Sequence, residues 1–207
     1  MLELLIVRHG ESVADIEGRH EGQADFPLTD LGRWQAEQVA EWIAARVPPD
    51  LVIASPLRRA AETAEIIARR VAIPITLNDD LRELGNGVYA GLTFEEAEER
   101  YPWPEGGWKD HEAPPAGESR IAFRARIETF WSRLRWTTEP GKRIAIIAHG
   151  GVIQMLFQCF LRLPIDAEVW LRTGYAGMHL WRVNGDERQV LFGNLQAHSE
   201  TGSPPVT

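Results

Sequence analysis

The stretch LLIVRHGES, residues 4–12, places an arginine and a histidine at the point where a run of apolar residues ends. The apolar run at residues 2–7 is short and rich in β-forming side chains, which is typical of a buried strand. Gly10 follows directly and lets the backbone turn. The sequence therefore predicts a strand whose carboxyl end presents Arg8 and His9 side by side.

Apolar strands and amphipathic helices alternate along most of the chain. Residues 28–47 carry apolar side chains at three- and four-residue steps and predict a helix, with Thr29 or Asp30 as its amino-terminal cap. The same pattern predicts, in chain order, a strand at 50–55, a helix at 56–72, a short strand at 73–77, a helix at about 118–136, a strand at 143–149 and a helix at 150–163. Three later segments alternate like antiparallel strands: EVWLRT (168–173), GMHLWRV (177–183) and RQVLFGN (188–194).

This order of elements predicts an α/β fold, a three-layer α/β/α sandwich with a mostly parallel central sheet and an antiparallel edge. In such folds, ligands bind at the carboxyl ends of the strands. The strand ends that carry polar side chains are Arg8-His9, Ser55-Pro56-Leu57-Arg58 and His149-Gly150-Gly151. We expect them to meet at one edge of the sheet.

A length of 207 residues suits one domain, spanning residues 1–207. Residues 84–119 are rich in glycine and proline and predict a long excursion with one short helix near 93–101. Such a segment is usually functional or mobile, and the sequence leaves open whether it closes over a ligand. Residues 197–207 are predicted to form a flexible tail.

The protein is acidic, with a formal net charge of −8. That charge argues against nucleic acid or an anionic membrane as its main partner, because both require a dense positive surface. No stretch approaches the roughly 18 apolar residues of a membrane span, and the apolar run before Arg8 is too short for a signal peptide. Cys159 is the single cysteine, which favours a buried thiol in a reducing, cytoplasmic compartment. The oligomeric state stays open, a homodimer included.

Two arginines and two histidines, Arg8, Arg58, His9 and His149, are expected at the same sheet edge of this acidic protein. Their charges would repel one another unless an anion lay among them. A metal ion is not expected, because no third histidine or cysteine occurs at these strand ends and the arginines would repel a cation. We therefore expect an anion-binding site without a metal or cofactor.

Five motifs follow one another along the chain: RHGES, GQADFPLTDLGRWQA, ASPLRRAAETA, LRELGNGVYAG and AHGG. Together they resemble the histidine phosphatase superfamily, the phosphoglycerate mutase-like proteins, over about residues 2 to 195. An Arg-His-Gly tripeptide alone is a weak signal, but five motifs in register are a strong one. The resemblance implies the phosphoglycerate mutase-like fold and phosphoryl transfer through a phosphohistidine.

The resemblance also implies roles for the cationic residues. His9 would be the nucleophile, and a neutral imidazole can attack phosphorus near pH 7 without prior activation. Arg8 and Arg58 would hold the phosphoryl group, because the guanidinium fork binds phosphate oxygens in bidentate fashion. His149 would donate a hydrogen bond to the same group.

Further site residues follow from the same motifs. Glu83 would protonate the leaving group and then activate the attacking water. Gly150 and the amides after it would begin a helix whose amino terminus favours an anion. Three more residues align with the substrate pocket of the family, namely Ser12, Glu21 and Gly22. Glu21 could equally be a solvated loop residue.

Asp15 departs from the pattern of the family, which has asparagine at this position. A carboxylate facing phosphate would repel it. We therefore expect Asp15 to turn aside, or to be neutralised by His20 or an arginine, and we expect no direct contact between Asp15 and phosphate.

A second departure separates hydrolysis from mutase activity. The mutase branch carries E-R-x-Y-G after the acid and an Arg-Arg pair before its Pro-Pro segment, whereas this sequence has ELGNG and WKDHEAPP. Without those cations a phosphorylated intermediate is not returned to the product, so water is the expected acceptor.

The predicted function is therefore a histidine acid phosphatase-type phosphomonoesterase that acts on a small phosphorylated metabolite and releases inorganic phosphate. Two alternatives stay open: a phosphoglycerate mutase, and a non-catalytic protein that binds a phosphorylated ligand.

The tryptophans have two expected roles. Trp103 and Trp108 lie in the excursion, where they either line the substrate pocket or, as we favour, anchor the long loop. The others that fall in periodic segments are expected to pack in the core or at its edge: Trp131, Trp136, Trp170 and Trp181.

Overall fold

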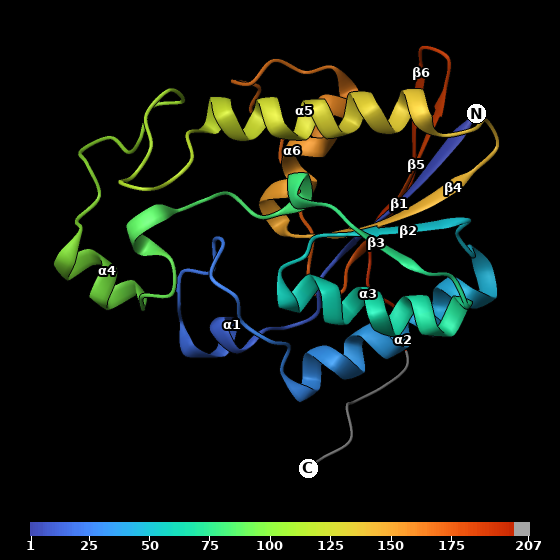
Figure 1. Ribbon diagram of the computed structural model, residues 1–207, viewed down its shortest axis with the longest axis horizontal. Helices are drawn as coiled ribbons and strands as arrows, with labels where there is room; N and C mark the ends of the chain where they lie inside the picture. Colours follow the sequence, from blue (N-terminus) through green and yellow to red (C-terminus); the bar gives the residue numbers. More distant parts are fainter. Residues whose placement is uncertain (201–207) are drawn as a thin grey trace.

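The computed structural model describes residues 1–200 as one six-stranded sheet with helices on both faces (Figure 1). The strand order is β3-β2-β4-β1-β5-β6. The predicted three-layer α/β/α sandwich is confirmed. The strands are β1 (Leu2–Arg8), β2 (Leu51–Ala54), β3 (Ile75–Leu77), β4 (Arg143–Ala148), β5 (Met178–Asn184) and β6 (Glu187–Leu195).

The sheet is parallel in one half and antiparallel in the other. β1 pairs with β4, β4 with β2, and β2 with β3, all parallel, while β5 and β6 form an antiparallel hairpin beside β1. β1 therefore lies between a parallel and an antiparallel neighbour. Its interior residues 4–7 are fully buried on both faces, which explains why the sequence there is a continuous apolar run.

The helices form the outer layers. α5 (Arg120–Thr137) and α6 (Gly150–Leu161) cover one face of the sheet, and α2 (Asp30–Arg46) and α3 (Arg58–Val71) cover the other (Figure 1). A hydrophobic core lies on each face of the sheet, and alternate residues of β1 point into one or the other. Leu4 and Ile6 pack with α5 and α6, and Leu5 and Val7 pack with α2 and α3.

Local sequence determines where several helices begin. Thr29, rather than Asp30, caps α2 by accepting a hydrogen bond from the Gly32 amide. Within the excursion, the predicted short helix is present as α4 (Phe94–Arg100), and Thr93 and Glu96 form a capping box at its start. Short elements that the periodicity did not predict are α1 (Val13–Glu17) and the 3₁₀ turns η1 (Asp79–Leu81) and η2 (Gly87–Tyr89).

The excursion is anchored by aromatic stacking. Tyr89 is almost fully buried, and its ring lies parallel to that of Trp103 with 5.0 Å between centroids. His20 packs edge-on against Phe94, which joins α4 to the loop after α1. The expected anchoring role fits this geometry for Trp103.

Three sequence expectations need correction. Residues 168–173 form no strand, because their backbone is held by the Gln154 side chain instead of a neighbouring strand. Trp136 and Trp170 are each 87% exposed, so these two lie outside the core that contains Trp131 and Trp181.

The predicted tail also needs correction at its start. Residues 197–200 form a short helix, α7 (Ala197–Glu200), and Ala197 packs in the core beneath α2. Residues 201–207, the rest of the predicted flexible tail, lie outside the described residues. Among residues 1–200, no helix is both long and apolar enough to cross a membrane.

Candidate active site

The carboxyl ends of three neighbouring strands bring the site together. His9 follows β1, Ser55 follows β2 and His149 follows β4, and the sheet order places β2, β4 and β1 side by side. The rings of His9 and His149 lie 5.2 Å apart between centroids. The expectation that these strand ends converge is confirmed.

His9 is buried in the form that a nucleophile requires. Its Nδ1 lies 2.7 Å from the carbonyl oxygen of Gly10, and because a carbonyl only accepts hydrogen bonds, the ring proton must be on Nδ1. The Nε2 lone pair is left free, and this atom is buried without a hydrogen-bond partner. Burial, together with the charges of Arg59 and Arg8, lowers the pKa of His9 well below its ordinary value. The imidazole is therefore neutral near pH 7.

Gly10 has a different role from the one expected. Its φ is not positive, so the turn does not require glycine. Instead, a Cβ on Gly10 would overlap the carbonyl oxygen of Gly32 in α2. The glycine allows α2 to pack closely beside the nucleophile, and the Gly10 amide donates to the hydroxyl of Thr63 on α3.

Arg58 does not reach the site. Its guanidinium pairs with Glu62 at 2.7 Å, and the side chain is 58% exposed. The next residue, Arg59, is fully buried and donates to the carbonyl oxygens of Gly22 and Ala24. Adjacent helical residues point about 100° apart, so only one of the two arginines can face inward. The sequence prediction named the wrong arginine of the pair.

The other predicted cations are in place. Arg8 donates to the carbonyl oxygen of Thr173 at 2.9 Å, and its guanidinium lies over the ring of Tyr175. His149 contacts the hydroxyl of Ser55 through Nε2 at 2.8 Å, and both residues are fully buried. Burial, Arg59 and His9 lower the pKa of His149 well below its ordinary value. The sequence did not predict the contact of Ser55 with His149 or that of Tyr175 with Arg8, because the two residues of each contact are far apart in the chain.

Four buried nitrogens of this cluster have no hydrogen-bond partner in the described chain: Arg8 Nε, His9 Nε2, Arg59 Nε and His149 Nδ1. Buried polar atoms without partners are rare, because each costs free energy. Arg59 Nε has one ionic neighbour, the Glu21 carboxylate at 3.2 Å. An anion with several oxygens could accept from Arg8 Nε, Arg59 Nε and His149 Nδ1, and its central atom would then lie next to the lone pair of His9 Nε2.

Glu83 is held beside this cluster by the start of α6. Its carboxylate accepts from the amides of Leu84 at 2.7 Å and Gly151 at 2.9 Å. The predicted anion preference of this helix terminus is thus satisfied by Glu83 itself. Gly150, the residue before, makes only an ordinary approach to Arg8: an added Cβ would lie 3.9 Å from Arg8 Nε.

Asp15 stays close to the nucleophile instead of turning aside, and its partners are not the expected ones. One carboxylate oxygen accepts from the amide and hydroxyl of Ser12 and so completes a capping box at the start of α1. The other oxygen accepts from the hydroxyl of Tyr175 at 2.9 Å. Neither His20 nor an arginine is paired with Asp15 among the described residues.

Glu21 is no solvated loop residue. Its carboxylate lies 3.7 Å from His9 Nε2 and 2.6 Å from the Ser12 hydroxyl, in addition to its ion pair with Arg59. Gly22 contributes its carbonyl oxygen to Arg59 and adopts a positive φ of 46°. Of the three predicted pocket residues, Glu21 faces the nucleophile, Ser12 contacts Glu21, and Gly22 supports the buried arginine.

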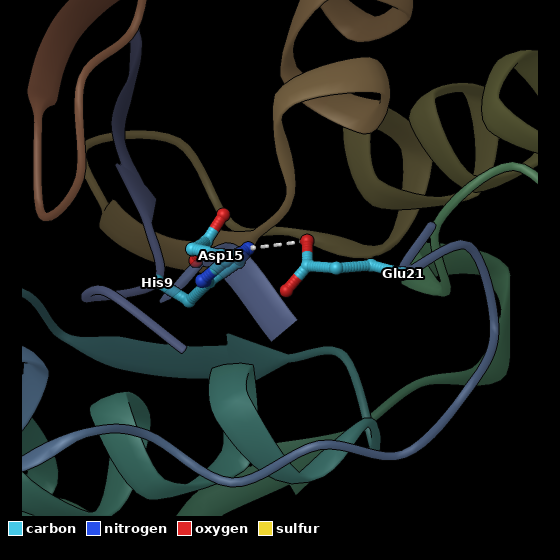
Figure 2. A group of neighbouring side chains, drawn as sticks. All are labelled: His9, Asp15 and Glu21. Carbon is cyan, nitrogen blue, oxygen red and sulfur yellow. Dashed lines mark ion pairs between the residues drawn. The ribbon is translucent and has the colours of Figure 1, made fainter. Parts of the chain in front are cut away.

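The side chains of His9, Asp15 and Glu21 point toward one another (Figure 2). One possible ligand atom from each residue lies within 4.8 Å of the other two. Such spacing can admit a cation. However, Arg59 and Ser12 already engage Glu21, while Ser12 and Tyr175 engage Asp15. The neighbouring guanidinium groups also oppose a positive ion. These contacts favour an anion-binding site over a metal centre.

A cavity of about 400 Å³ opens beside these groups. Glu21 and Glu83 line it together with residues of the excursion, including Asn86 and Phe94. A second cavity of about 360 Å³ shares Leu84 and other wall residues with the first. The space next to Glu83 could therefore hold a group attached to the bound anion.

Comparison with known proteins assigns the family. The family model described as histidine phosphatase superfamily (branch 1) matches residues 4–196. The chain belongs to the histidine phosphatase superfamily. The resemblance read from the five motifs is thereby confirmed.

Individual histidine phosphatases are similar to this chain along most of their length. A glucosyl-3-phosphoglycerate phosphatase of Mycolicibacterium vanbaalenii is 34% identical, covering 97% of this chain and 88% of the relative. An adenosylcobalamin/alpha-ribazole phosphatase of Escherichia coli is 32% identical, covering 80% and 82%. A solved mycobacterial glucosyl-3-phosphoglycerate phosphatase complexed with VO3 superposes with a TM-score of 0.82 at 30% identity, covering 93% of this chain and 98% of that one.

Proposed function

We propose that this histidine phosphatase, acting as one catalytic domain, is a phosphomonoesterase that hydrolyses a small phosphorylated metabolite through a phosphohistidine intermediate. One observation carries the proposal: the free Nε2 of a neutral, buried His9 lies among unpartnered nitrogens of Arg8, Arg59 and His149. Similarity to two phosphatases of small phosphorylated metabolites supports it. The complex of a relative with a vanadium oxyanion is also consistent with it.

The first step is attack by His9 on phosphorus. The bond between Nε2 and phosphorus forms as the bond from phosphorus to the ester oxygen breaks. Arg8 and Arg59 stabilise the charge that spreads over the phosphoryl oxygens, and His149 donates to the same group. Glu83, held at the start of α6, supplies a proton to the departing alkoxide.

The second step regenerates the enzyme. Glu83, now a carboxylate, accepts a proton from water, whose oxygen attacks phosphorus and displaces His9 Nε2. Inorganic phosphate leaves, and the imidazole returns to its neutral form. Positioning and electrostatic stabilisation by the two arginines supply most of the required catalysis.

Hydrolysis is favoured over the mutase reaction by the charges of the cavity. Arg19 is the one arginine or lysine among the described residues that line it, and its guanidinium is bound to Glu17 and the Gly91 carbonyl. A second phosphate or a carboxylate would therefore have to compete with Glu17 for this single cation. The retained intermediate of a mutase needs such a clamp, so water is the proposed acceptor.

The proposal also covers the type of phosphatase, its location in the cell and its oligomeric state. An acid phosphatase type is proposed because two carboxylates, Asp15 and Glu21, lie close to the nucleophile. A cytoplasmic location is proposed from the free, buried thiol of Cys159. A homodimer stays an expectation.

The test compares wild-type protein with His9→Ala. Wild type should release phosphate from p-nitrophenyl phosphate, and His9→Ala should lose at least about 10³-fold in rate, since the nucleophile is absent. Quenched wild-type enzyme should carry an acid-labile, base-stable phosphoryl group that the variant lacks. Thermal unfolding serves as the folding control.

Three outcomes would contradict the proposal. Equal rates of the two proteins would remove His9 from catalysis. Inactivity of wild type on a panel of phosphorylated metabolites would favour a binding protein. Conversion of 3-phosphoglycerate into 2-phosphoglycerate, without free phosphate, would favour the mutase.

A further inference from the structure

Glu21 is the carboxylate that faces the nucleophile. Its side chain comes from the loop after α1 and points at the ring of His9, with the contact to Nε2 drawn as a dashed line in Figure 2. The same carboxylate pairs with Nε of Arg59. It therefore lies at the rim of the space where the proposed function puts a phosphoryl group.

The hydroxyl of Ser12 lies between the carboxylates of Glu21 and Asp15 and cannot serve both as a donor. The Ser12 hydroxyl lies 2.6 Å from Glu21 Oε1 and 2.9 Å from Asp15 Oδ2. A hydroxyl has one proton and can donate it to only one of these oxygens. If Ser12 donates to Asp15, the short contact with Glu21 requires a proton on Glu21, which then donates to Ser12. Asp15 has further donors in the Ser12 amide and Tyr175, so Asp15 is the one that stays charged.

The surroundings of Glu21 contain charges of both signs. Arg59 on α3 and Arg8 at the end of β1 favour its ionised form, whereas Asp15 on α1 opposes it. Burial is the largest influence and raises the pKa of Glu21 above its ordinary value. Two more titratable groups lie near it, His9 after β1 and Tyr175, and Arg19, His20 and Glu83 line the same cavity.

We propose that Glu21 binds the phosphoryl group as a neutral carboxylic acid whose proton, carried on Oε2, is donated to a phosphoryl oxygen, while the Ser12 hydroxyl turns its own proton from Asp15 to Glu21 Oε1. This inference rests on the proposed function and adds a protonation requirement to the same site. A dianion entering beside Asp15 and an ionised Glu21 would meet two negative charges, and the proton removes one of them. The free donor on Glu21 then completes the ring of donors from Arg8, Arg59 and His149.

The sign of the pH dependence follows from this requirement. Below the pKa of Glu21 the carboxyl group is neutral, and binding of a dianion needs no proton. Above that pKa, each binding event must take up one proton at Glu21. The affinity for a dianion should therefore fall about tenfold per pH unit as the pH rises past the pKa of Glu21.

Sulfate is the probe, because it stays a dianion across the whole range and contributes no titration of its own. Its dissociation constant would be measured by calorimetry between pH 4.5 and 8, with EDTA present to exclude bound cations. Wild type should show the tenfold loss per pH unit over the upper part of this range. Glu21→Gln, which keeps the shape but carries no ionisable proton, should lose that slope and bind sulfate more tightly than wild type at pH 8.

Asp15→Asn is the matched control, since it makes the same carboxylate-to-amide change in a neighbouring residue. In Asp15→Asn the affinity for sulfate should still fall as the pH rises. The fall should begin at a lower pH than in wild type, because removal of the Asp15 charge lets Glu21 ionise more easily. An unchanged slope in Glu21→Gln would overturn the proposal, and so would the loss of the slope in Asp15→Asn alone.

A second measurement covers the case in which Glu21→Gln does not fold. Infrared spectroscopy of Glu83→Gln saturated with sulfate, in which the other proposed carboxylic acid of the site is absent, should show a protonated carboxyl band at a pH where Glu21 would otherwise be ionised, and absence of this band would overturn the proposal. Neither measurement involves turnover. Failure here is therefore distinct from failure of the proposed function, which is decided by phosphate release with His9→Ala.

Discussion

Arg59 is a buried charge whose surroundings offset much of the cost of burying it. Two backbone carbonyls, from Gly22 and Ala24, accept from its guanidinium, and Glu21 provides a counter-charge. Burial lowers the pKa of Arg59, although nearby carboxylates oppose this shift. A guanidinium held this firmly presents its Nε to the site with little freedom, which suits electrostatic stabilisation of a phosphoryl group.

The two neighbouring arginines form a matched pair for a test. Arg59→Met should lower kcat/KM for p-nitrophenyl phosphate by about 10³-fold, because the substitution removes the inward-facing charge while keeping much of the volume. Arg58→Met should stay within about twofold of wild type, since it removes only an exposed pair with Glu62. Steady-state kinetics measures both, with thermal unfolding as a control. A comparable loss in Arg58→Met would refute the assignment.

At the scale of elements, the junction of β4 and α6 positions the proposed acid. His149 follows β4 and precedes α6, and two residues later the Gly151 amide binds the carboxylate of Glu83. Arg126 on α5 holds the other side of this segment by donating to the carbonyl oxygens of Asp80 and Arg82. The acid is thus fixed by two helices that pack on the same face of the sheet.

The two glycines of α6 test this arrangement. In Gly151→Ala the new Cβ would overlap Glu83 Oε1 and displace the carboxylate, whereas in Gly150→Ala it would make only ordinary contact. Gly151→Ala should lower kcat by about 10²-fold, the smaller end of the range for a general acid. Gly150→Ala should remain within about threefold of wild type.

Stability separates this effect from unfolding. Alanine is favoured over glycine in helix interiors by up to about 1 kcal/mol, which opposes the loss of the hydrogen bond between the Gly151 amide and Glu83, so both variants should unfold close to the wild-type temperature. Full activity of a stable Gly151→Ala enzyme would mean that Glu83 needs no contact with α6.

At the scale of the whole molecule, the sheet is tied together at the end opposite the site. Glu3 at the start of β1 binds Arg143 of β4 and Arg182 of β5, so one carboxylate joins the parallel and antiparallel halves. Burial opposes its ionisation, but the hydrogen bonds from Arg182 and Arg143 prevail, and the pKa of Glu3 is lowered. The contacts of Glu3 with Arg143 and Arg182 lie far from the candidate active site, so we expect them to affect the stability of the protein and not its activity.

Glu3→Gln should therefore destabilise the protein in a pH-dependent manner. A lowered pKa in the folded state stabilises the protein above the ordinary carboxyl pKa, and this contribution is lost as the pH falls through the lowered pKa. Urea unfolding should show a loss of about 2 kcal/mol at pH 7, between the values for surface and buried pairs, and a smaller loss near pH 3. Phosphatase activity at pH 7 should be unchanged. An equal loss at both pH values would contradict this account.

The sequence by itself determined the order of strands and helices, the α/β class and the presence of Arg8, His9 and His149 at strand ends. These features depend on local patterns: an apolar run that ends in polar residues predicts a strand end, and parallel strands bring such ends to one edge. The motifs also identified the family and predicted the role that is proposed for Glu83.

Only the tertiary structure decided which groups lie opposite one another. Arg58 and Arg59 are adjacent in the sequence, and the packing of α3 on the sheet chose the second. The contacts that define the site join Ser12 to Glu21, Ser55 to His149 and Glu83 to Gly151, across 9 to 94 residues of chain. Periodicity reports that a side chain is buried, but its partner depends on how separate elements pack, and no local pattern contains that information.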